Sequence, residues 1–548
     1  MSRSRYASEF TWIAFGISLI ICLAITAFAW YLILPAINVQ YPGFWWMIIL
    51  GLGSSILISV FFGELGNYDT PRSWITLGII VLLIVILLIF MLLSSQVCAA
   101  SKFEDIAQIK TDGIFSDDIP AIDSSDDIPT IDKATAQKLG DRSMGAMAKY
   151  ISQYEVSNEY NLICYNGKYY RVSPLMYGSN FKAHSNRNVG IPGYVLVDVY
   201  TGKVELVELE GEETIRYAPS AIFGNDLTRY LRSKYPTKVF AEANFEIDDE
   251  GIPHYIVPTL KVNAGVFGAP SIDTVLIVNA VNGDVQEYSI DKVPEWVDNV
   301  YDVTRIMQEI DWKYSLVHGA INLSDRDVRK TSYEFDKRQY YAIPKDGHVY
   351  IYTGVTSAGS DESNIGFLLI NMRDGKATYY ADPGAEESSA QTSALGLIPG
   401  MAYSAGPVML VNINEEQTYF FALKDSQLLV KKYALVNKTD YTIVVVEDTI
   451  EKAVDVYQEK LGLVSTEPVV EAPIETKTVT GIVSSVYEVT MNGNTMFIIY
   501  LDGKNEIYVS SITNSFEQPA RLIIGATVTM NYCVENGTNI VNKITFVQ

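Results

Sequence analysis

Three long apolar runs near its start constrain this 548-residue chain more than any other feature. Residues 10–37, 44–63 and 73–95 carry no charged side chain. A helix needs about 20 apolar residues to cross a hydrocarbon core about 30 Å thick, and each run is long enough. A cleaved signal peptide is shorter and occurs once, so it does not account for three runs in close succession. We predict that residues 10–98 form three transmembrane helices.

The few charged residues around these runs predict their orientation. The first hundred residues contain only six charged side chains, which are Arg3, Arg5, Glu9, Glu64, Asp69 and Arg72. Lys and Arg tend to remain in the cytoplasm, and the loop 38–43 after the first run has neither. We therefore expect a multi-pass cell-membrane protein with residues 1–9 inside and everything after residue 95 outside the cytoplasm. Because these charges cancel, the formal charge of -23 falls wholly on the exported part.

The composition excludes several classes of function. The formal charge of -23 argues against wrapping a phosphate backbone, which needs clustered Lys and Arg, so no nucleic acid partner is expected. Four Cys without a CxxC pair exclude a disulfide scaffold, although Cys164 and Cys533 could pair if their domains touch. The four His, which are His184, His254, His318 and His348, form no metal-binding motif. We expect no metal and no cofactor.

Residues 99–133 form an acidic segment with a nine-residue echo. Asp117 to Asp123 reads DDIPAID, and Asp126 to Asp132 reads DDIPTID. Carboxylates attract hard cations, but neither copy has the alternating ligands and the glycine of a calcium loop. We favour a solvated linker with extended Ile-Pro steps, and whether it captures a cation stays open.

Residues 134–463 contain an internal repeat built on two kinds of turn. The first turn of each copy lies at Asn166-Gly167, Glu250-Gly251 and Asp346-Gly347. The second turn follows an apolar strand and contains Gly202, Gly283 and Gly375. Glycine supplies the positive φ that a tight hairpin needs, so we predict antiparallel hairpins. A fourth, degenerate copy is expected between residues 411 and 460.

Segments with helical spacing separate the copies. Residues 226–234 and 451–460 are expected to be helical. A further helix is predicted from the spacing of Trp296, Val300, Val303, Met307 and Ile310. Hairpins that alternate with helices build layered α+β units.

This order of helix, hairpin and closing strand resembles PepSY-type domains, which are small α+β modules of extracytoplasmic bacterial proteins. The second copy carries the resemblance best, in Ile247-Asp-Asp-Glu-Gly251 and in Val278-Asn-Ala-Val-Asn-Gly283. The resemblance covers most of residues 134–463. It implies binding or regulation, including inhibition of peptidases, and it supplies no catalytic residues.

The C-terminal part predicts a linker followed by a small barrel. Residues 464–477 are rich in Pro and Glu, which is typical of a linker. Residues 478–548 contain five β-rich stretches separated by glycines, and they resemble an OB-fold barrel. Many such barrels bind oligonucleotides, but this one carries three basic and five acidic side chains. Contact with protein or an envelope polymer is therefore the better expectation.

No catalytic residue is predicted. Ser357 and Ser404 lie in sequences close to a nucleophile elbow, but both lack the glycine two places before the serine. The sharp turn from strand to helix needs that glycine to avoid a clash, which argues against a serine hydrolase.

Two groups of polar residues in the repeats are expected to be structural. His254 and His348 occupy similar turns of two copies, so we expect both side chains to be exposed beside their hairpins. Glu246, Asp248 and Glu250 resemble the start of a calcium loop, but the glutamate that would end such a loop is missing. We therefore favour an acidic turn without a metal.

These inferences predict a membrane-anchored α+β protein with three transmembrane helices, PepSY-like repeats and a five-stranded OB-like barrel. Its expected function is non-enzymatic binding or scaffolding in the cell envelope. The expected partners are the lipid bilayer and other envelope or secreted proteins. A regulator or inhibitor of secreted peptidases, and an enzyme with an unrecognised site in the repeats, stay open as alternatives. The oligomeric state also stays open.

Overall fold

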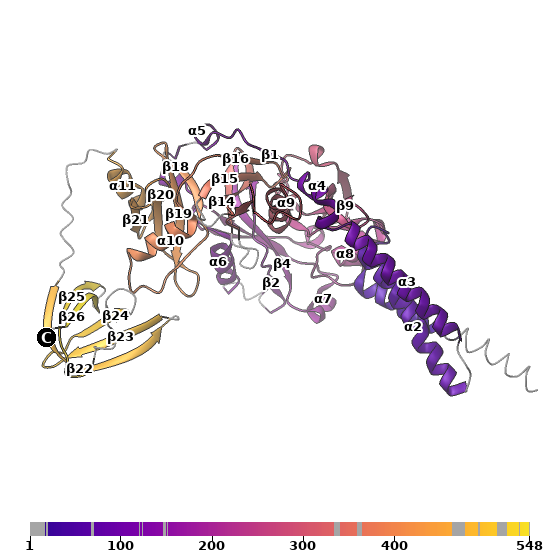
Figure 1. Ribbon diagram of the computed structural model, residues 1–548, viewed down its shortest axis with the longest axis horizontal. Coiled ribbons are helices and arrows are strands. Elements are labelled where there is room, and N and C mark those ends of the chain that lie inside the picture. Colours follow the sequence, from indigo (N-terminus) through magenta and orange to yellow (C-terminus); the bar gives the residue numbers. More distant parts are fainter. Residues whose placement is uncertain are drawn as a thin grey trace, which may run out of the picture.

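The architecture is taken from a computed structural model. The residues it describes are 17, 20–66, 71–119, 121–122, 124–145, 150, 152–333, 340–358, 364–462, 477–491, 494–511, 523–535 and 538–546. Figure 1 shows apolar helices at one end, a body of packed sheets in the middle and a small barrel at the other end. The predicted tail 1–9 and nearly all of the linker 464–477 lie outside the described residues.

One of the N-terminal helices is long and apolar enough to cross a membrane, as predicted. Among the described residues, Ile75–Leu93 alone is long and apolar enough to cross a bilayer, with 19 residues and a mean hydropathy of 3.4. It forms most of α3 (Pro71–Leu93). The described apolar parts of the two preceding helices, Ile20–Ile33 and Pro42–Ile56, are shorter, although α2 as a whole spans Pro42–Gly66. The helix lengths therefore do not support three full spans.

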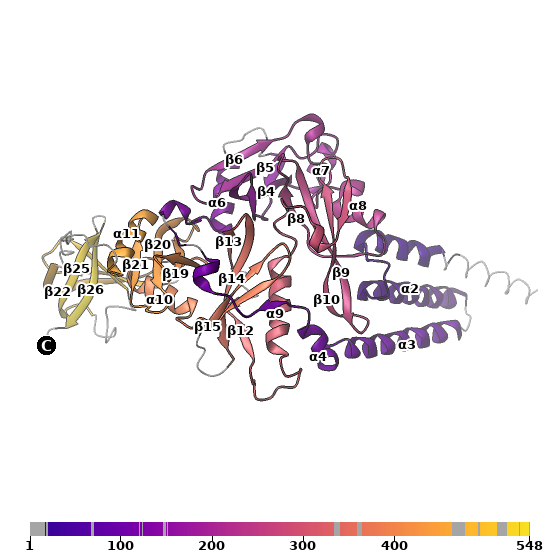
Figure 2. The same cartoon turned by 90° about the horizontal axis from the view of Figure 1, so that it is seen from above.

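The helices nevertheless form one bundle, and they lie side by side in Figure 2. Cys22 Sγ of the first helix donates to Gly51 O of α2 at 3.0 Å, and it lies 3.2 Å from Ser54 Oγ. Small residues allow this close approach, because a Cβ on Gly51 would lie 3.1 Å from Thr26 Oγ1. Large apolar side chains point outward from the bundle, among them Phe28 at 64% exposure. Such a surface is typical of contact with lipid.

The four sheets of the body share one topology. In each, two short strands pair with the two halves of one edge of a long strand, and two further strands continue as an antiparallel meander. The first unit contains β2 (Tyr154–Val156), β3 (Asn161–Tyr165), β4 (Lys168–Tyr177), β5 (Gly193–Asp198) and β6 (Val204–Glu208). The second contains β7 (Val239–Phe240), β8 (Asn244–Ile247), β9 (Pro253–Ala264), β10 (Gly268–Asn279) and β11 (Val285–Tyr288).

The remaining two units repeat the pattern. The third contains β12 (Arg329–Thr331), β13 (Tyr341–Lys345), β14 (His348–Ser357), β15 (Asn364–Asn371) and β16 (Ala377–Tyr380). The fourth contains β17 (Ser404–Ala405), β18 (Met409–Ile413), β19 (Glu416–Lys424), β20 (Val430–Asn437) and β21 (Val444–Glu447). The internal repeat is therefore confirmed, including its fourth copy.

Helices precede and follow these sheets. The α-helices are α4 (Gln96–Glu104), α5 (Phe115–Asp118), α6 (Lys133–Gly145), α7 (Asn180–Asn186), α8 (Leu227–Lys234), α9 (Val303–Ser315), α10 (Glu387–Gly396) and α11 (Ile450–Lys460). The predictions for 226–234 and 451–460 are confirmed. The helix predicted from Trp296 onward is wrong in its first part, because α9 begins only after Asp302, whose side chain accepts a hydrogen bond from Arg305 N.

The first turn of each repeat needs a left-handed backbone. Asn166 and Gly167 have φ of 51° and 74°. Two such residues in a row make the type I′ turn whose twist matches that of the flanking strands, and Asn and Gly adopt it at low cost. In the fourth unit Asn414 and Glu415 adopt the same conformation, with φ of 53° and 67°. The fourth unit thus has the same turn geometry, although Glu415 replaces the glycine.

In all four units, an Asp or Asn at the start of the second turn stabilises that turn. Its Oδ1 accepts hydrogen bonds from backbone N–H groups two or three residues later, at 2.8–3.0 Å. The residues are Asp198, Asn279, Asn371 and Asn437. An Asp or Asn that closes such a turn fixes the end of the strand, which explains the pattern before the glycine.

The segment that follows α4 corrects the prediction of a solvated linker. We call residues 105–133 the strap. Its β1 (Ile109–Lys110) adds to the third sheet in parallel with β16. Further along, Ile122 N donates to Asn412 O of the fourth sheet at 2.8 Å. The strap therefore ties the chain to its third and fourth units before the first unit begins.

The acidic echo is partly buried beneath the fourth unit. Ile128 is 1% exposed, and Tyr341 donates a hydrogen bond to Pro129 O. Asp132 ends the strap in a buried ion pair with Lys424. Burial alone would raise the pKa of Asp132, but the Lys424 ammonium and the hydrogen bonds from Lys424 and Thr135 together outweigh burial and lower the pKa. The isoleucines of the echo thus fill a core.

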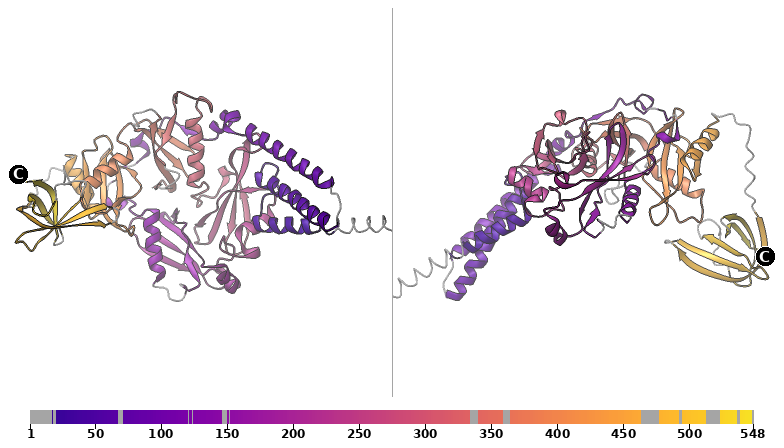
Figure 3. Two further views of the ribbon diagram at one scale, coloured as in Figure 1. Left: turned by 60° about the horizontal axis from the view of Figure 1, so that its bottom comes forward. Right: turned by 180° about the vertical axis from the view of Figure 1, so that it is seen from behind.

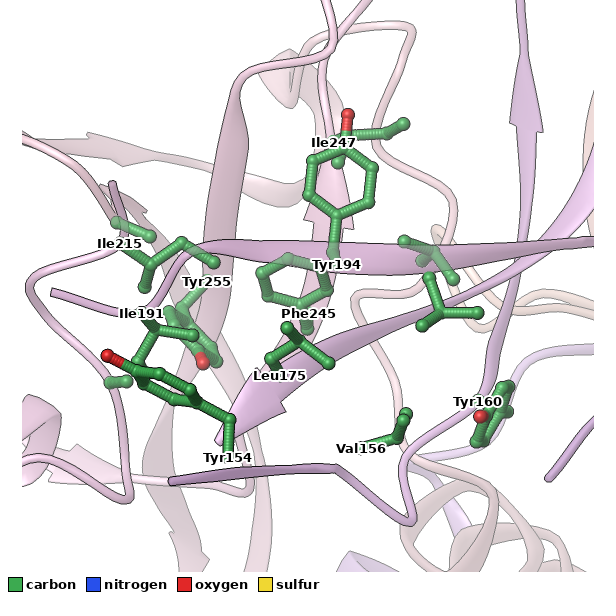
Figure 4. Packing of buried hydrophobic residues seen from close by; sticks show 14 of the residues in the cluster. Tyr154, Val156, Tyr160, Leu175, Ile191, Tyr194, Ile215, Phe245, Ile247 and Tyr255 are labelled. Atoms are coloured by element: carbon green, nitrogen blue, oxygen red, sulfur yellow. The ribbon is translucent and has the colours of Figure 1, made fainter. Parts of the chain in front are cut away.

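Tyrosines make much of the core that the first two units share (Figure 4). Tyr194 and Phe245 have ring centroids 6.1 Å apart, and Phe245 and Tyr255 5.3 Å apart. Tyr154 donates to Gly190 O at 2.8 Å, so its ring is buried while its hydroxyl is paired.

The C-terminal strands close into a barrel. Its strands are β22 (Lys477–Met491), β23 (Asn494–Leu501), β24 (Ile507–Ser511), β25 (Thr527–Glu535) and β26 (Thr538–Phe546). Their order around the barrel is β22-β23-β24-β26-β25, with β24 and β26 parallel. The prediction of a closed five-stranded barrel is confirmed, and Figure 3 shows it from two further sides.

Candidate functional site

A cavity of about 740 Å³ lies where the third unit meets the fourth. Strands β12 and β14 form one wall, while α10 and β17 form another. Most of the lining side chains end in a hydroxyl, for example Ser332, Tyr352 and Thr353. This volume is within the range of ligand-binding pockets.

Glu387, the first residue of α10, brings a buried carboxyl group to this cavity. It is 8% exposed. Its Oε1 accepts hydrogen bonds from the Tyr352 hydroxyl at 3.0 Å and from Ser332 Oγ at 3.1 Å. Its Oε2 has no hydrogen-bond partner among the described residues. Gly354 provides the space, because a Cβ there would lie 2.1 Å from Oε1.

Among the described residues, no cation forms a direct ion pair with the Glu387 carboxylate. Burial raises the pKa of Glu387, and the neighbouring Glu386 carboxylate adds to that rise. The buried Lys438 ammonium is engaged elsewhere, since Lys438 Nζ bonds Asp382 O and lies 3.7 Å from Asp382 Oδ2. Oε2 is therefore left to accept a hydrogen bond from a ligand.

Two sheet edges also face this cavity. β12 ends the strand order of the third sheet, and β17 ends that of the fourth. Ser332 N donates to Gly354 O, so by strand alternation the N–H and C=O of Thr331 point away from β14. Gly406 N donates to Ala422 O, so those of Ala405 likewise point away from β19. Thr331 and Ala405 both line the cavity.

The structure brings together residues that the sequence treated separately. Ser357 and Ser404 both line this cavity, although the sequence predicted no shared site for them. No histidine is among the described residues that line it. Glu387 was missed because no motif surrounds it. The available signal was Gly354, since a glycine inside a strand pattern marks a close approach of other atoms.

A second polar cluster lies where the first three units meet, and we call it the three-unit junction. Glu246 of β8 is fully buried, and it accepts hydrogen bonds from Asp298 N at 2.9 Å and from Asn299 N at 2.6 Å. Asp298 in turn accepts from Cys164 N of β3 at 2.5 Å. Asn299 Nδ2 donates to Leu162 O at 2.8 Å. The two carboxyl groups thus link the first and second sheets to the segment that precedes α9.

Both carboxyl groups of the junction resist ionisation. Burial raises the pKa of Glu246 to about 7, although the donors from Asp298 and Asn299 oppose the rise. Burial and the nearby Glu246 raise the pKa of Asp298 well above its usual value. The Arg373 guanidinium lowers the pKa of each, but by less than burial raises it.

The expected exposure of His254 is wrong. Its side chain is buried, because Trp296 covers it with ring centroids 5.0 Å apart. His254 Nδ1 lies 2.9 Å from Ile252 O, and burial lowers the pKa of the imidazole. His348, its counterpart in the third unit, is half-buried. These histidines are parts of their hairpins.

The acidic turn and the cysteines form no metal site within the described chain. Asp248 Oδ1 accepts from Glu250 N at 3.1 Å and from Ile252 N at 2.8 Å, so it closes its own turn. Glu246 faces inward to the three-unit junction instead of joining them. Among the described residues, no three His, Cys, Asp or Glu lie together as metal ligands would. Cys164 is a free thiol.

Comparisons with known proteins assign no family. No family model matches the chain, and no curated protein matches it. Among solved structures, a levansucrase variant from B. megaterium has 11% identity and a TM-score of 0.17, with 82% of this chain and 96% of that chain covered. A levansucrase variant from Bacillus subtilis has 10% identity and a TM-score of 0.15, with 79% and 91% covered. At TM-scores this low the likeness carries no argument about fold or activity.

Proposed function

We propose that this protein is a membrane-anchored, extracytoplasmic binding or scaffold protein of the cell envelope. One observation carries the proposal. The apolar helices are joined to the second unit by specific hydrogen bonds, whereas the ligand-sized cavity lies in the third and fourth units. The chain thus holds a binding site at a fixed place relative to its anchor.

Two arginines of α8, the buried Arg232 and the half-buried Arg229, join the body to the first helix. Arg232, 5% exposed, donates to Leu34 O at 3.0 Å, and Arg229 donates to Tyr31 O at 2.7 Å. Both carbonyls belong to the end of the first helix, where cations are favourable. Ser94, just after α3, accepts from Val266 N at 2.9 Å. The body is therefore attached to two of the apolar helices.

The proposed topology of three crossings rests on which helix ends lie beside the body. The end of the first helix, the start of α2 and the end of α3 all lie on the side of the body (Figure 2). Ile37 N donates to Pro236 O at 2.8 Å, so the loop between the first two helices contacts the body. The start of α3, which carries Arg72, then belongs to the opposite, cytoplasmic side.

The repeats and the barrel support binding over catalysis. Four units of one topology present many similar edges and turns, as expected of PepSY-like modules. The strand order of the barrel, with β24 parallel to β26, supports the OB-like interpretation. Both resemblances stay predictions.

A topology experiment tests the proposal. Single cysteines are introduced at Leu323, which is 96% exposed on the body, and at Val39, which is 57% exposed in the first loop, with the native cysteines replaced. A membrane-impermeant maleimide applied to intact cells should label both. Labelling that requires cell lysis at both positions would place the body in the cytosol and end the proposal. A matched position in the cytoplasmic loop 67–70 should react only after lysis.

A further inference from the structure

We infer that the cavity at Glu387 binds an extended, basic peptide segment of another protein, which adds as a strand to the edge of β12. This inference rests on the proposed function and names the ligand of its site. Three independent features support it: a buried carboxylate oxygen without a partner, a free sheet edge beside it, and the charge of the whole body.

The first feature selects a ligand that donates hydrogen bonds. Oε2 of Glu387 is buried without a partner among the described residues, while Tyr352 and Ser332 hold Oε1 in place. An unpaired buried carboxylate is costly, and an ammonium or guanidinium group relieves that cost with a charge-assisted hydrogen bond. A Lys or Arg side chain supplies such a group. Lys330, which also lines the cavity, is exposed. Its positive charge would repel a basic side chain, so the Lys or Arg of the peptide must bind away from it.

The second feature selects an extended backbone. The N–H and C=O of Thr331 point away from β14, toward the side where the third sheet has no further described strand. An extended peptide pairs with such an edge through its main chain, and alternate side chains then enter the neighbouring pocket. The edge of β17 across the cavity offers Ala405 in the same way. A folded or globular ligand would use neither edge.

The third feature is electrostatic. The formal charge of -23 falls on residues 101–548, because the six charges of the first hundred residues cancel. A surface of one sign raises the rate at which oppositely charged partners arrive. A basic segment is therefore favoured over an acidic one before any contact forms.

The test uses the full chain in detergent and a short fluorescent peptide of alternating Lys and Thr, with binding followed by anisotropy. Matched probes are the same peptide with Glu in place of Lys, and a version N-methylated along one edge. We expect the Lys peptide to bind and both other probes to bind at least about tenfold more weakly. The Glu peptide loses the charge-assisted hydrogen bond, and the N-methylated peptide loses main-chain hydrogen bonds to the sheet edge.

Variants of the chain locate the site. Glu387→Gln preserves shape and removes the charge, and we expect it to weaken binding by about tenfold. Glu451→Gln makes the same change of charge on the exposed face of α11, outside the cavity, and should bind like the native chain. Thr331→Pro removes the outward N–H from the edge of β12, so it should bind more weakly than Thr331→Ala, which keeps that group.

The outcomes are decisive. Three results would each overturn the inference. The Lys and Glu peptides could bind with equal affinity, or Glu387→Gln and Glu451→Gln could lose equal affinity. The third is equal binding by Thr331→Pro and Thr331→Ala. Saturable binding of a neutral oligosaccharide that Glu387→Gln abolishes would also overturn it. If the peptide fails while the maleimide experiment still places the body outside, the inference falls and the proposed function stands.

Discussion

The three-unit junction should open more easily as the pH rises, because folding there retains a proton. Burial raises the pKa of Glu246 from 4.5 to about 7. A group whose folded pKa is raised binds more protons in the folded state, so its contribution to stability is fully present below pH 4.5. That contribution is lost as the pH rises through about 7.

The size of the effect follows from the shift. A rise from 4.5 to about 7 corresponds to about 3 kcal/mol of stability that is lost when the proton is released. This corresponds to about a 100-fold change in the equilibrium between closed and open junction. Glu246→Gln mimics the protonated carboxyl at every pH, so the variant should lose nearly all of the dependence.

Hydrogen exchange measures this opening locally. The amides of Asp298 and Asn299 donate to Glu246, so they exchange only when the junction opens. Protection of peptides that cover them, corrected for the intrinsic rate, should fall by about 100-fold between pH 4.5 and pH 8 in the native chain. A native chain whose protection is constant, or a Glu246→Gln chain with the same slope, would refute the reasoning.

Three further variants test packing by urea unfolding of the solubilised chain. Lys424→Met leaves the buried Asp132 carboxylate without its ion-pair partner, and it should lower the free energy of unfolding by about 3–5 kcal/mol. Gly354→Ala places a Cβ 2.1 Å from Glu387 Oε1, so it should cost about 1–3 kcal/mol and weaken peptide binding. Glu415→Gly removes strain from a residue at φ 67°, and it should raise stability by about 1 kcal/mol.

Each variant has its own control. Adding Asp132→Leu to Lys424→Met should recover much of the loss, because it removes the stranded charge; a double variant as unstable as the single one would contradict this account. Gly396→Ala, where an added Cβ meets nothing within 4 Å, should not destabilise the chain. For Glu415→Gly, a lower unfolding midpoint would show that the turn is not strained.

Local features of the fold were predictable because they depend on near neighbours. A hairpin turn needs residues that tolerate positive φ, so Asn166 and Gly167 reveal one directly. Alternating apolar residues with glycines between them predict the strands of the closed barrel. Asp226 and the spacing after it mark α8. The start of α9 was misjudged because Trp296 and Val300 repeat at helical spacing while packing outside a helix.

The functional features were not predictable, because their residues are far apart along the chain. Asp132 and Lys424 pair across 292 positions, and Glu246 bonds Asn299 across 53. Glu387 lies in a stretch with no motif, and it matters only because β14 leaves space above Gly354.

An apolar N-terminal bundle, repeated hairpins with helices between them, and a small barrel could all be predicted from the amino-acid sequence, since period and turn chemistry act over a few residues. Only the packing of distant surfaces buries the end of the strap, ties two carboxyl groups to the first two sheets, and sets Glu387 at a cavity between two sheet edges. Burial decides these points: whether a carboxylate is solvated or enclosed depends on which distant surfaces pack against it, and no local pattern records that.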